Sequence, residues 1–323
     1  MLKFVWRTDI HVSDHAPRRR SDDWNKALLE KIRWVGEFAK EVGADAVIDG
    51  GDFFDVKSPS KNSHRLIHQV IEAHQDYPCP IYANVGNHDC IYGDYSFLPQ
   101  QPLGVLFSAG VFRRLYDEHE LTLTSKDGTS VRVCGVPYHG VRYDMERFNI
   151  KKGSEDYLIT AAHVLASKTG GSMFEGEDIV KYGDLTQYDT DLWLFGHWHK
   201  DQGIAEIGEG KKAVNLGSLS RGSLSQDNLD RKPKVALITV SEKGLEVEEI
   251  IVPHKPASEV FNVEQKIREE AEEGRIASFV ESLKTLSNQS ATKLPIKDKI
   301  KSLDIGNEVK EKAYLLLEQF DVR

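Results

Sequence analysis

The sequence predicts an α/β protein in which two β-sheets are packed between outer layers, in a four-layer α/β/β/α sandwich. Seven short runs of β-branched and other apolar residues recur up to residue 240, with Gly or Asp at their ends. Helical patterns, with apolar residues every three to four positions, separate the early runs. Because a strand–helix–strand order requires parallel pairing, we expect one largely parallel sheet.

The expected elements follow in chain order. The predicted strands are residues 2–6, 44–48, 80–85, 131–136, 157–162, 192–195 and 235–240. Helices are predicted within 28–42 and 66–71. The later strands are closer together, and turn signals at 126–128 and 209–210 indicate hairpins. These hairpins predict a mixed second sheet.

A change of pattern near 253–256 predicts a domain boundary. Residues 1–256 carry the α/β pattern, whereas residues 257–323 show helical periodicity alone, with apolar positions such as Phe279 and Leu316. We therefore expect a main domain and a small helical C-terminal extension. Amphipathic helices of this kind either cover their own domain or dock on a partner.

The charge balance excludes one class of function. The formal net charge is −9, which argues against a protein that coats nucleic acid by bulk attraction. A nuclease remains compatible, because clustered carboxylates that hold cations make the sum negative. The basic stretches Arg18-Arg19-Arg20 and 231–234 are either phosphate contacts or ordinary solvated surface.

The sequence also predicts where the protein resides. No apolar run approaches the roughly 18 to 20 residues of a membrane helix. The first candidate site residue, Asp9, lies too near the start for removal of a signal peptide. Three cysteines without C-x-x-C spacing indicate reduced thiols rather than a disulfide framework. We expect a cytoplasmic protein.

Chemistry-bearing motifs follow the predicted strands, where loops of open α/β sheets assemble ligand sites. Asp9-Ile10-His11 offers a carboxylate and an imidazole to one cation. In the stretch from Gly50 to Asp55, glycines allow Asp52 to approach and bridge two cations. Each motif alone has an ordinary alternative, a helix cap with a surface histidine or a Gly-Asp turn.

Three further motifs complete the set. Gly86-Asn87-His88-Asp89 supplies an amide oxygen as a neutral ligand and a histidine that can reach a reacting phosphate. His163 follows a strand directly, and His197 and His199 leave another strand on the same side. An Asn turn, a core histidine and a structural histidine pair are the respective alternatives. The conjunction of five such motifs at strand exits decides for a metal site.

The order of these motifs resembles that of the calcineurin-like metallophosphoesterases over residues 1 to about 253. The order is D-x-H, G-D-x-x-D, G-N-H-D, a lone His and G-H-x-H. The resemblance implies two divalent metal ions bridged by Asp52. It assigns Asp9, His11, Asp52 and His199 to one metal, and Asp52, Asn87, His163 and His197 to the other. It makes His88 the catalytic histidine and Asp55 its orienting carboxylate.

Within that superfamily the chain is most similar to SbcD-type nuclease subunits. The Arg-Gly that usually follows Asp55 in protein phosphatases is absent, the third motif ends in Asp89 rather than Glu, and 136–138 and 215–221 resemble segments of the SbcD branch. The resemblance implies DNA as substrate, Mn²⁺ for activity, and an SbcC-like coiled-coil ATPase as partner. A homodimer also fits this family.

The types of the candidate ligands indicate which metal ions the site would prefer. Mixed carboxylate, amide and imidazole ligands suit Mn²⁺ or Fe²⁺ better than Ca²⁺, with Mg²⁺ as an alternative. Substrate-binding candidates are Arg18, Arg19, Arg20, Tyr138, His139 and Arg221. Two other functions stay open: a phosphodiesterase or pyrophosphatase acting on a small nucleotide, and a non-catalytic scaffold with the same fold.

Overall fold

In the computed structural model the chain divides into two compact units, Met1–Phe261 and Asn262–Arg323. The structure describes residues 1–91, 93–170 and 176–263, and beyond them residues 268, 271, 274–275, 296–302, 310–312 and 314. In the second unit it describes helix α7 (Ile296–Ser302). The predicted docking positions Phe279 and Leu316 lie outside the described residues.

The first sheet has the strand order β14-β13-β1-β2-β3-β4. Strands β1 to β4 run parallel, β13 pairs antiparallel with β1, and β14 pairs antiparallel with β13. The parallel part arises because a helical segment separates β1 from β2 and β2 from β3. Its strands are β1 (Leu2–Arg7), β2 (Ala46–Asp49), β3 (Ile81–Ala83), β4 (Arg113–Arg114), β13 (Lys234–Ser241) and β14 (Gly244–Ile251).

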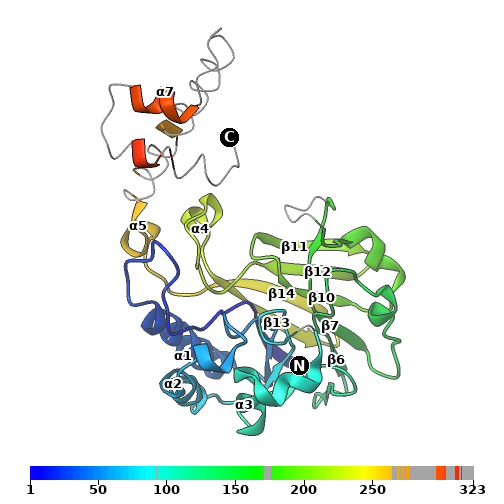
Figure 1. Ribbon diagram of the computed structural model, residues 1–323. Coiled ribbons are helices and arrows are strands. Elements are labelled where there is room, and N and C mark those ends of the chain that lie inside the picture. The colour runs from blue at the N-terminus through cyan, green and yellow to red at the C-terminus, as the bar shows by residue number, and fades with distance from the viewer. Residues whose placement is uncertain are drawn as a thin grey trace. The chain divides into compact units, whose positions relative to one another are not determined.

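Three helices cover one face of this sheet (Figure 1), namely α1 (Trp24–Val42), α2 (His64–His74) and α3 (Pro102–Ser108). Helix α1 begins where the Asp23 side chain accepts from the backbone N–H of Lys26, and it ends at Gly43, whose positive φ of 66° closes the last turn. Its apolar stripe packs with α2 against Val5 and Val47 of the sheet.

The second sheet has the order β11-β12-β10-β7-β6-β5, with parallel pairing in its centre and antiparallel edges. Side chains such as Trp6 and Ile48 of the first sheet meet Leu192 and Leu194 of the second in a core between the sheets. Its strands are β5 (Leu121–Thr124), β6 (Ser130–Val136), β7 (Tyr157–Val164), β10 (Leu192–His197), β11 (Asp201–Gly208) and β12 (Lys211–Leu216).

The outer face of the second sheet is covered by short elements. A third core joins Trp193 and Phe195 of the sheet to Phe148 and Leu185. Phe148 lies in the 3-10 helix η3 (Met145–Phe148) and Leu185 in the 3-10 helix η4 (Tyr182–Gln187). The small strand pair β8 (Ala166–Ser167) and β9 (Val180–Lys181) contributes to the same core. The remaining short helices are η1 (Pro59–Lys61), η2 (Tyr95–Gln100), α4 (Gln226–Asp230) and α5 (Ala257–Val260).

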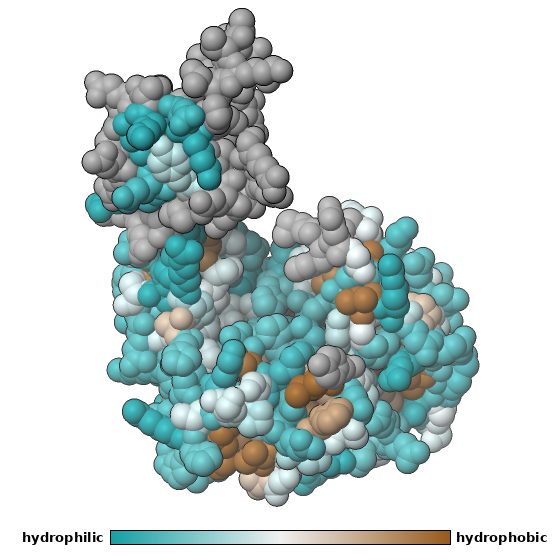
Figure 2. All heavy atoms as spheres, in the orientation of Figure 1, coloured by the Kyte–Doolittle hydropathy of each residue, from teal (hydrophilic) through white to brown (hydrophobic). Residues whose placement is uncertain are grey.

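The predicted fold class is confirmed, with two stacked sheets and helices on the first. All seven predicted strands form, and the turns at 126–128 and 209–210 join β5 to β6 and β11 to β12. The three cysteines are free thiols. None of the described helices is long and apolar enough to span a membrane. The side of the first unit seen in Figure 2 is mainly hydrophilic, with small separate apolar patches.

A buried polar network joins helix α2 to the carboxyl ends of β1 and β2. The Arg7 guanidinium donates to Asp49 Oδ2 at 2.8 Å, to His74 Nε2 at 2.9 Å and to the Tyr77 hydroxyl at 2.7 Å. Both partners of the Arg7–Asp49 ion pair are fully buried. The loops that leave these two strands are therefore held to a fixed base.

We predict that Arg7→Met lowers the free energy of unfolding by about 3 to 5 kcal/mol, because it leaves the buried Asp49 carboxylate without its cation. Urea denaturation followed by tryptophan fluorescence measures the change. The control Arg65→Met, on the exposed side of α2, should stay within about 0.5 kcal/mol of the parent. Equal stability of the two variants would show that the network contributes nothing.

Candidate metal centre

Loops from both sheets bring the predicted ligands to one edge of the sandwich. Asp9 and His11 follow β1, Asp52 follows β2, and Asn87 and His88 follow β3. His163 lies near the end of β7, and His197 and His199 lie at and beyond the end of β10. Because these strands are parallel within their sheets, their carboxyl ends meet at the same edge.

The backbone at this edge is strained. Asp9, His11, Asp52 and His197 all have positive φ values, of 53°, 53°, 51° and 87°. A left-handed conformation costs a residue with a side chain on the order of 1 to 3 kcal/mol, and it persists only where the surroundings impose it. Four such residues among seven predicted ligands indicate that side-chain placement is maintained here at the expense of backbone energy.

Glycines make the close approach of two loops possible. A Cβ added to Gly86 would lie 2.1 Å from Asp52 Oδ1, and one added to Gly51 would lie 2.6 Å from the backbone nitrogen of Gly86. No side chain is tolerated at such distances. The Gly50–Asp55 and Gly86–Asp89 loops therefore pack backbone to backbone, which brings Asp52 beside Asn87 and His88.

The first ligand group consists of Asp9, His11, Asp52 and His199, whose donor atoms lie within 4.8 Å of one another. The Nε2 atoms of His11 and His199 are 3.0 Å apart. Asp9 Oδ1 lies 3.9 Å from the former and 3.5 Å from the latter, and Asp52 Oδ2 lies 3.7 Å from His11 Nε2. Two imidazoles and two buried carboxylates thus face one point.

The second group consists of Asp52, His163 and His197, with Asn87 beside them. His163 Nε2 lies 3.3 Å from both Asp52 Oδ2 and Asn87 Oδ1. The Nδ1 atom of His163 donates to the Gly50 carbonyl at 2.8 Å, which leaves Nε2 as the nitrogen that faces Asp52 and Asn87. The same oxygen of Asp52 therefore faces both groups, as the predicted bridging role requires.

The electrostatics of these groups fit divalent cations. Burial opposes ionisation of Asp9, yet its hydrogen bond to His199 and the nearby imidazoles lower its pKa to about 2. Burial likewise opposes protonation of His163, but without a cation the Asp52 carboxylate raises its pKa to about 9, so a metal ion at Nε2 would replace a proton there. Ionised carboxylates, an amide oxygen and imidazoles, without a thiolate, form a donor set suited to ions such as Mn²⁺ and Fe²⁺.

Comparison with known proteins identifies the family of this chain. Residues 2–201 match the model of the family described as calcineurin-like phosphoesterase. The chain is a calcineurin-like phosphoesterase. A dimetal phosphatase from Danio rerio has a similar fold, with TM-score 0.50 and 10% identity over 78% of this chain and 99% of the other. The calcineurin-like phosphoesterase YfkN from Bacillus subtilis gives TM-score 0.47 and 15% identity over 79% and 93%.

In this phosphoesterase His88 is oriented by a backbone group. Its Nδ1 atom donates to the Asp55 carbonyl oxygen at 2.6 Å, so that Nε2 is left for the substrate. The Asp55 carboxylate is 4.0 Å from His88 Nδ1 but 3.4 Å from His11 Nδ1. The structure therefore gives the orienting contact to the main chain of Asp55, and its side chain is nearer to the metal ligand His11.

Asp89 is a structural residue of the phosphoesterase site whose role sequence reasoning missed. Its carboxylate accepts hydrogen bonds from the backbone N–H groups of Asp52, Phe53, Phe54 and Gly86, at 2.7 to 3.3 Å. It thereby fastens the two loops that carry Asp52 and His88. Its place directly after His88 was the available signal.

Glu177 is a second residue that sequence reasoning missed. Its Oε1 atom lies 3.0 Å from His197 Nε2 and accepts a hydrogen bond from the Tyr143 hydroxyl at 2.7 Å. A carboxylate on one ring nitrogen leaves Nδ1 of His197 for a cation and fixes the orientation of the ring. No strand exit or motif marks Glu177, so nothing in the sequence pointed to it.

The predicted substrate-binding residues lie in different environments. Tyr138 lies at the site, with its ring centroid 5.3 Å from that of His197. Both ring nitrogens of His139 are engaged within the protein, at the Pro137 carbonyl and the Asp144 N–H. The Arg20 guanidinium binds Asp22 and the Arg221 carbonyl, and Arg221 is itself buried. Arg20, Arg221 and His139 are thus engaged by contacts within the domain, and His139 is half-buried.

We predict that Asp52→Ala abolishes the binding of both metal ions, because one oxygen of Asp52 faces both ligand groups. Metal content after dialysis and calorimetric titration with Mn²⁺ measure the loss. The exposed Asp76→Ala variant should bind like the parent. Retention of two equivalents by Asp52→Ala would contradict the bridging arrangement.

We also predict that Glu177→Ala weakens one of the two metal sites by about 10- to 100-fold, since His197 loses its orienting partner. Titration with Mn²⁺ should show one altered and one unaltered site, with Glu177→Gln intermediate. The control Glu209→Ala removes an exposed carboxylate in the β11–β12 turn. If Glu177→Ala still binds two Mn²⁺ ions with the affinity of the parent, Glu177 has no role in metal binding.

Proposed function

We propose that this phosphoesterase is a Mn²⁺-dependent DNA nuclease, the SbcD-like subunit of a complex that processes DNA ends. The observation that carries the proposal is the complete convergent ligand set with His88 beside it. Support for a polymeric substrate comes from exposure, because the side chains of His199, Asp55 and His88 are 47%, 43% and 41% exposed at the site. Side chains exposed to this extent favour access by a large substrate.

Each side chain has a task in phosphodiester hydrolysis. When bound, two divalent cations lower the pKa of water and neutralise charge that builds up on the phosphate. Asp52 and Asp9 supply the negative charge that holds them, and His163 and His197 are kept in fixed orientations by Gly50 and Glu177. His88, whose Nδ1–H donates to the Asp55 carbonyl, acts in its doubly protonated form and would give the proton on Nε2 to the departing sugar oxygen, leaving a neutral imidazole.

Degradation of end-labelled single- and double-stranded DNA in Mn²⁺ tests this function. A chromogenic phosphodiester and a dinucleoside pyrophosphate are assayed beside it, because the same metal centre serves small substrates. We expect DNA products whose formation stops on chelation. Hydrolysis of the small substrates with intact DNA would transfer the protein to the nucleotide phosphodiesterases or pyrophosphatases, and no hydrolysis at all would favour the scaffold.

The proposed partner is an SbcC-like coiled-coil ATPase, with residues 257–323 as the docking element, and a homodimer of the nuclease subunit is compatible with it. The test is co-expression with such an ATPase, followed by deletion of 257–323. Loss of the complex on deletion supports docking through this stretch. An intact complex would assign the contact to the first unit.

We predict that His88→Ala lowers turnover by at least about two orders of magnitude while both metal ions remain bound, the effect typical of a positioned acid or base. Single-turnover hydrolysis of DNA and a Mn²⁺ titration are the two measurements. The exposed His68→Ala variant serves as control. Full activity of His88→Ala would remove it from the mechanism.

For the basic stretch we predict that Arg18→Ala with Arg19→Ala weakens DNA binding uniformly across sequences. The slope of log K against log salt concentration should decrease by about one per lost phosphate contact. Lys126→Ala, in the β5–β6 turn, is the matched control. An unchanged slope would assign Arg18 and Arg19 to ordinary surface.

A further inference from the structure

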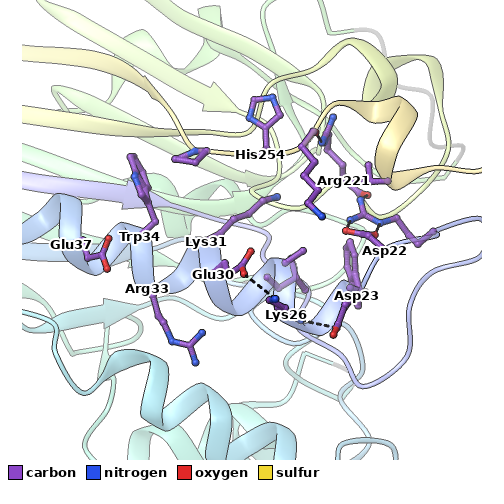
Figure 3. Close-up of a pocket in the computed structure, with 17 residues that line it drawn as sticks. Asp22, Asp23, Lys26, Glu30, Lys31, Arg33, Trp34, Glu37, Arg221 and His254 are labelled. Carbon is purple, nitrogen blue, oxygen red and sulfur yellow. Dashed lines mark hydrogen bonds and ion pairs between the residues drawn. The ribbon is translucent and has the colours of Figure 1, made fainter.

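A separate pocket of about 640 Å³ lies between helix α1 and the segment that follows β14. Its lining includes Lys31 and Trp34 from α1, Arg221 from the loop after β12, and Pro253 and His254. None of the predicted metal ligands lines it. In Figure 3 the Lys31 side chain extends from α1 toward Arg221 and His254, whereas Trp34 lies toward the other end.

The end of the pocket near Lys31 carries positive charge that the protein does not neutralise. Lys31 and Arg221 are only 9% and 4% exposed. Among the described residues, no carboxylate oxygen forms an ion pair with either side chain. Lys31 Nζ donates to the Leu219 carbonyl at 2.8 Å, and an ammonium has two further donors. The buried Nε of Arg221 has no hydrogen-bond partner.

The carboxylates around the pocket are occupied elsewhere. Asp22 accepts from Nε and Nη2 of Arg20, Asp23 caps α1, and Glu30 pairs with Lys26 at 3.9 Å. Glu37 lies at the Trp34 end, away from the cations, as Figure 3 shows. Among the described residues no carboxylate therefore forms an ion pair with Lys31 or Arg221, and Asp22 acts on them only through space, although both are almost fully withdrawn from water.

Such an arrangement costs folding free energy. Burial first, and then the charges of Arg221, Arg20 and Arg231, lower the pKa of Lys31 to about 7. Burial and the neighbouring cations also lower the pKa of Arg221 to about 10. The unfolded chain binds these protons more readily than the folded one, so the cluster destabilises the fold at neutral pH and below. Unpaired buried charge of this kind marks a binding site for the opposite charge.

The rest of the pocket suits an apolar, planar group. Trp34 stacks on Phe38 with ring centroids 5.3 Å apart, so its ring is held in place, and Pro253 lines the pocket with it. The volume falls in the range of small-molecule sites. A cationic end and an aromatic end within one pocket match a phosphate joined to a nucleobase.

We propose that this pocket binds a nucleoside monophosphate, with the phosphate at Lys31 and Arg221 and the base at Trp34. Charge-assisted hydrogen bonds from the two cations hold the phosphate oxygens. The site is distinct from the metal centre and does not depend on the proposed nuclease activity.

Calorimetric titration of the full chain, freed of metal by chelation, tests the pocket with adenosine monophosphate, thymidine monophosphate, inorganic phosphate and adenosine. We expect one equivalent of either nucleotide to bind, inorganic phosphate to bind more weakly, and adenosine not to bind. Lys31→Met should weaken nucleotide binding at least about tenfold, the effect of one charge-assisted hydrogen bond. Lys40→Met, exposed on the same helix and outside the pocket, should bind like the parent.

Two further variants separate the alternatives. Lys255→Ala alters an exposed residue of the pocket lining without touching the core, and it should also weaken binding. His163→Ala should leave the nucleotide affinity unchanged. If His163→Ala removes binding and Lys31→Met does not, the nucleotide binds at the metal centre and the proposal is overturned. The proposal is also overturned if the parent protein does not bind nucleotides. It is overturned likewise if the parent binds single-stranded oligonucleotides through Lys31 but does not bind mononucleotides.

Discussion

The site depends on how the Asp52 carboxylate is held. Its Oδ1 accepts the backbone N–H of His88 at 2.7 Å, and its Oδ2 faces His11 and His163. The Asp52 backbone is held in turn by Asp89, in a left-handed conformation that only close loop packing supports. One acceptor thus ties the acid–base histidine and both ligand groups to the same loop, so their relative positions are set before any cation arrives.

The fold was predictable where burial imposes a period on the sequence. Strands such as β7 and β10 are buried on both faces and read as continuous apolar runs, and α1 shows a clear stripe. Helix α3 has no such pattern. It has seven residues, and its Gly104 is required because a Cβ there would lie 1.8 Å from the Leu98 carbonyl oxygen. Such a segment is shaped by its neighbours rather than by its own periodicity.

The candidate site was predictable in its ligands and not in their supports. Ligands occur at strand exits within short motifs, so Asp9, Asn87 and His199 could be found from order and spacing alone. Glu177 reaches His197 from 20 residues away through a loop, a contact that no local pattern encodes. The environment of Arg20 was equally hidden from the sequence, since its contacts with Trp24 and Phe261 exist only in the folded chain.

The loop from Gly217 to Arg221 touches both regions of interest. The N–H of Leu219 donates to the Thr8 carbonyl next to Asp9, while its own carbonyl receives Lys31, and the N–H of Ser218 donates to the carbonyl of His199. A ligand in the Lys31 pocket that displaces this short segment changes the affinity of the metal centre for divalent cations. Thermodynamic reciprocity then obliges those ions to change the affinity for that ligand by the same factor.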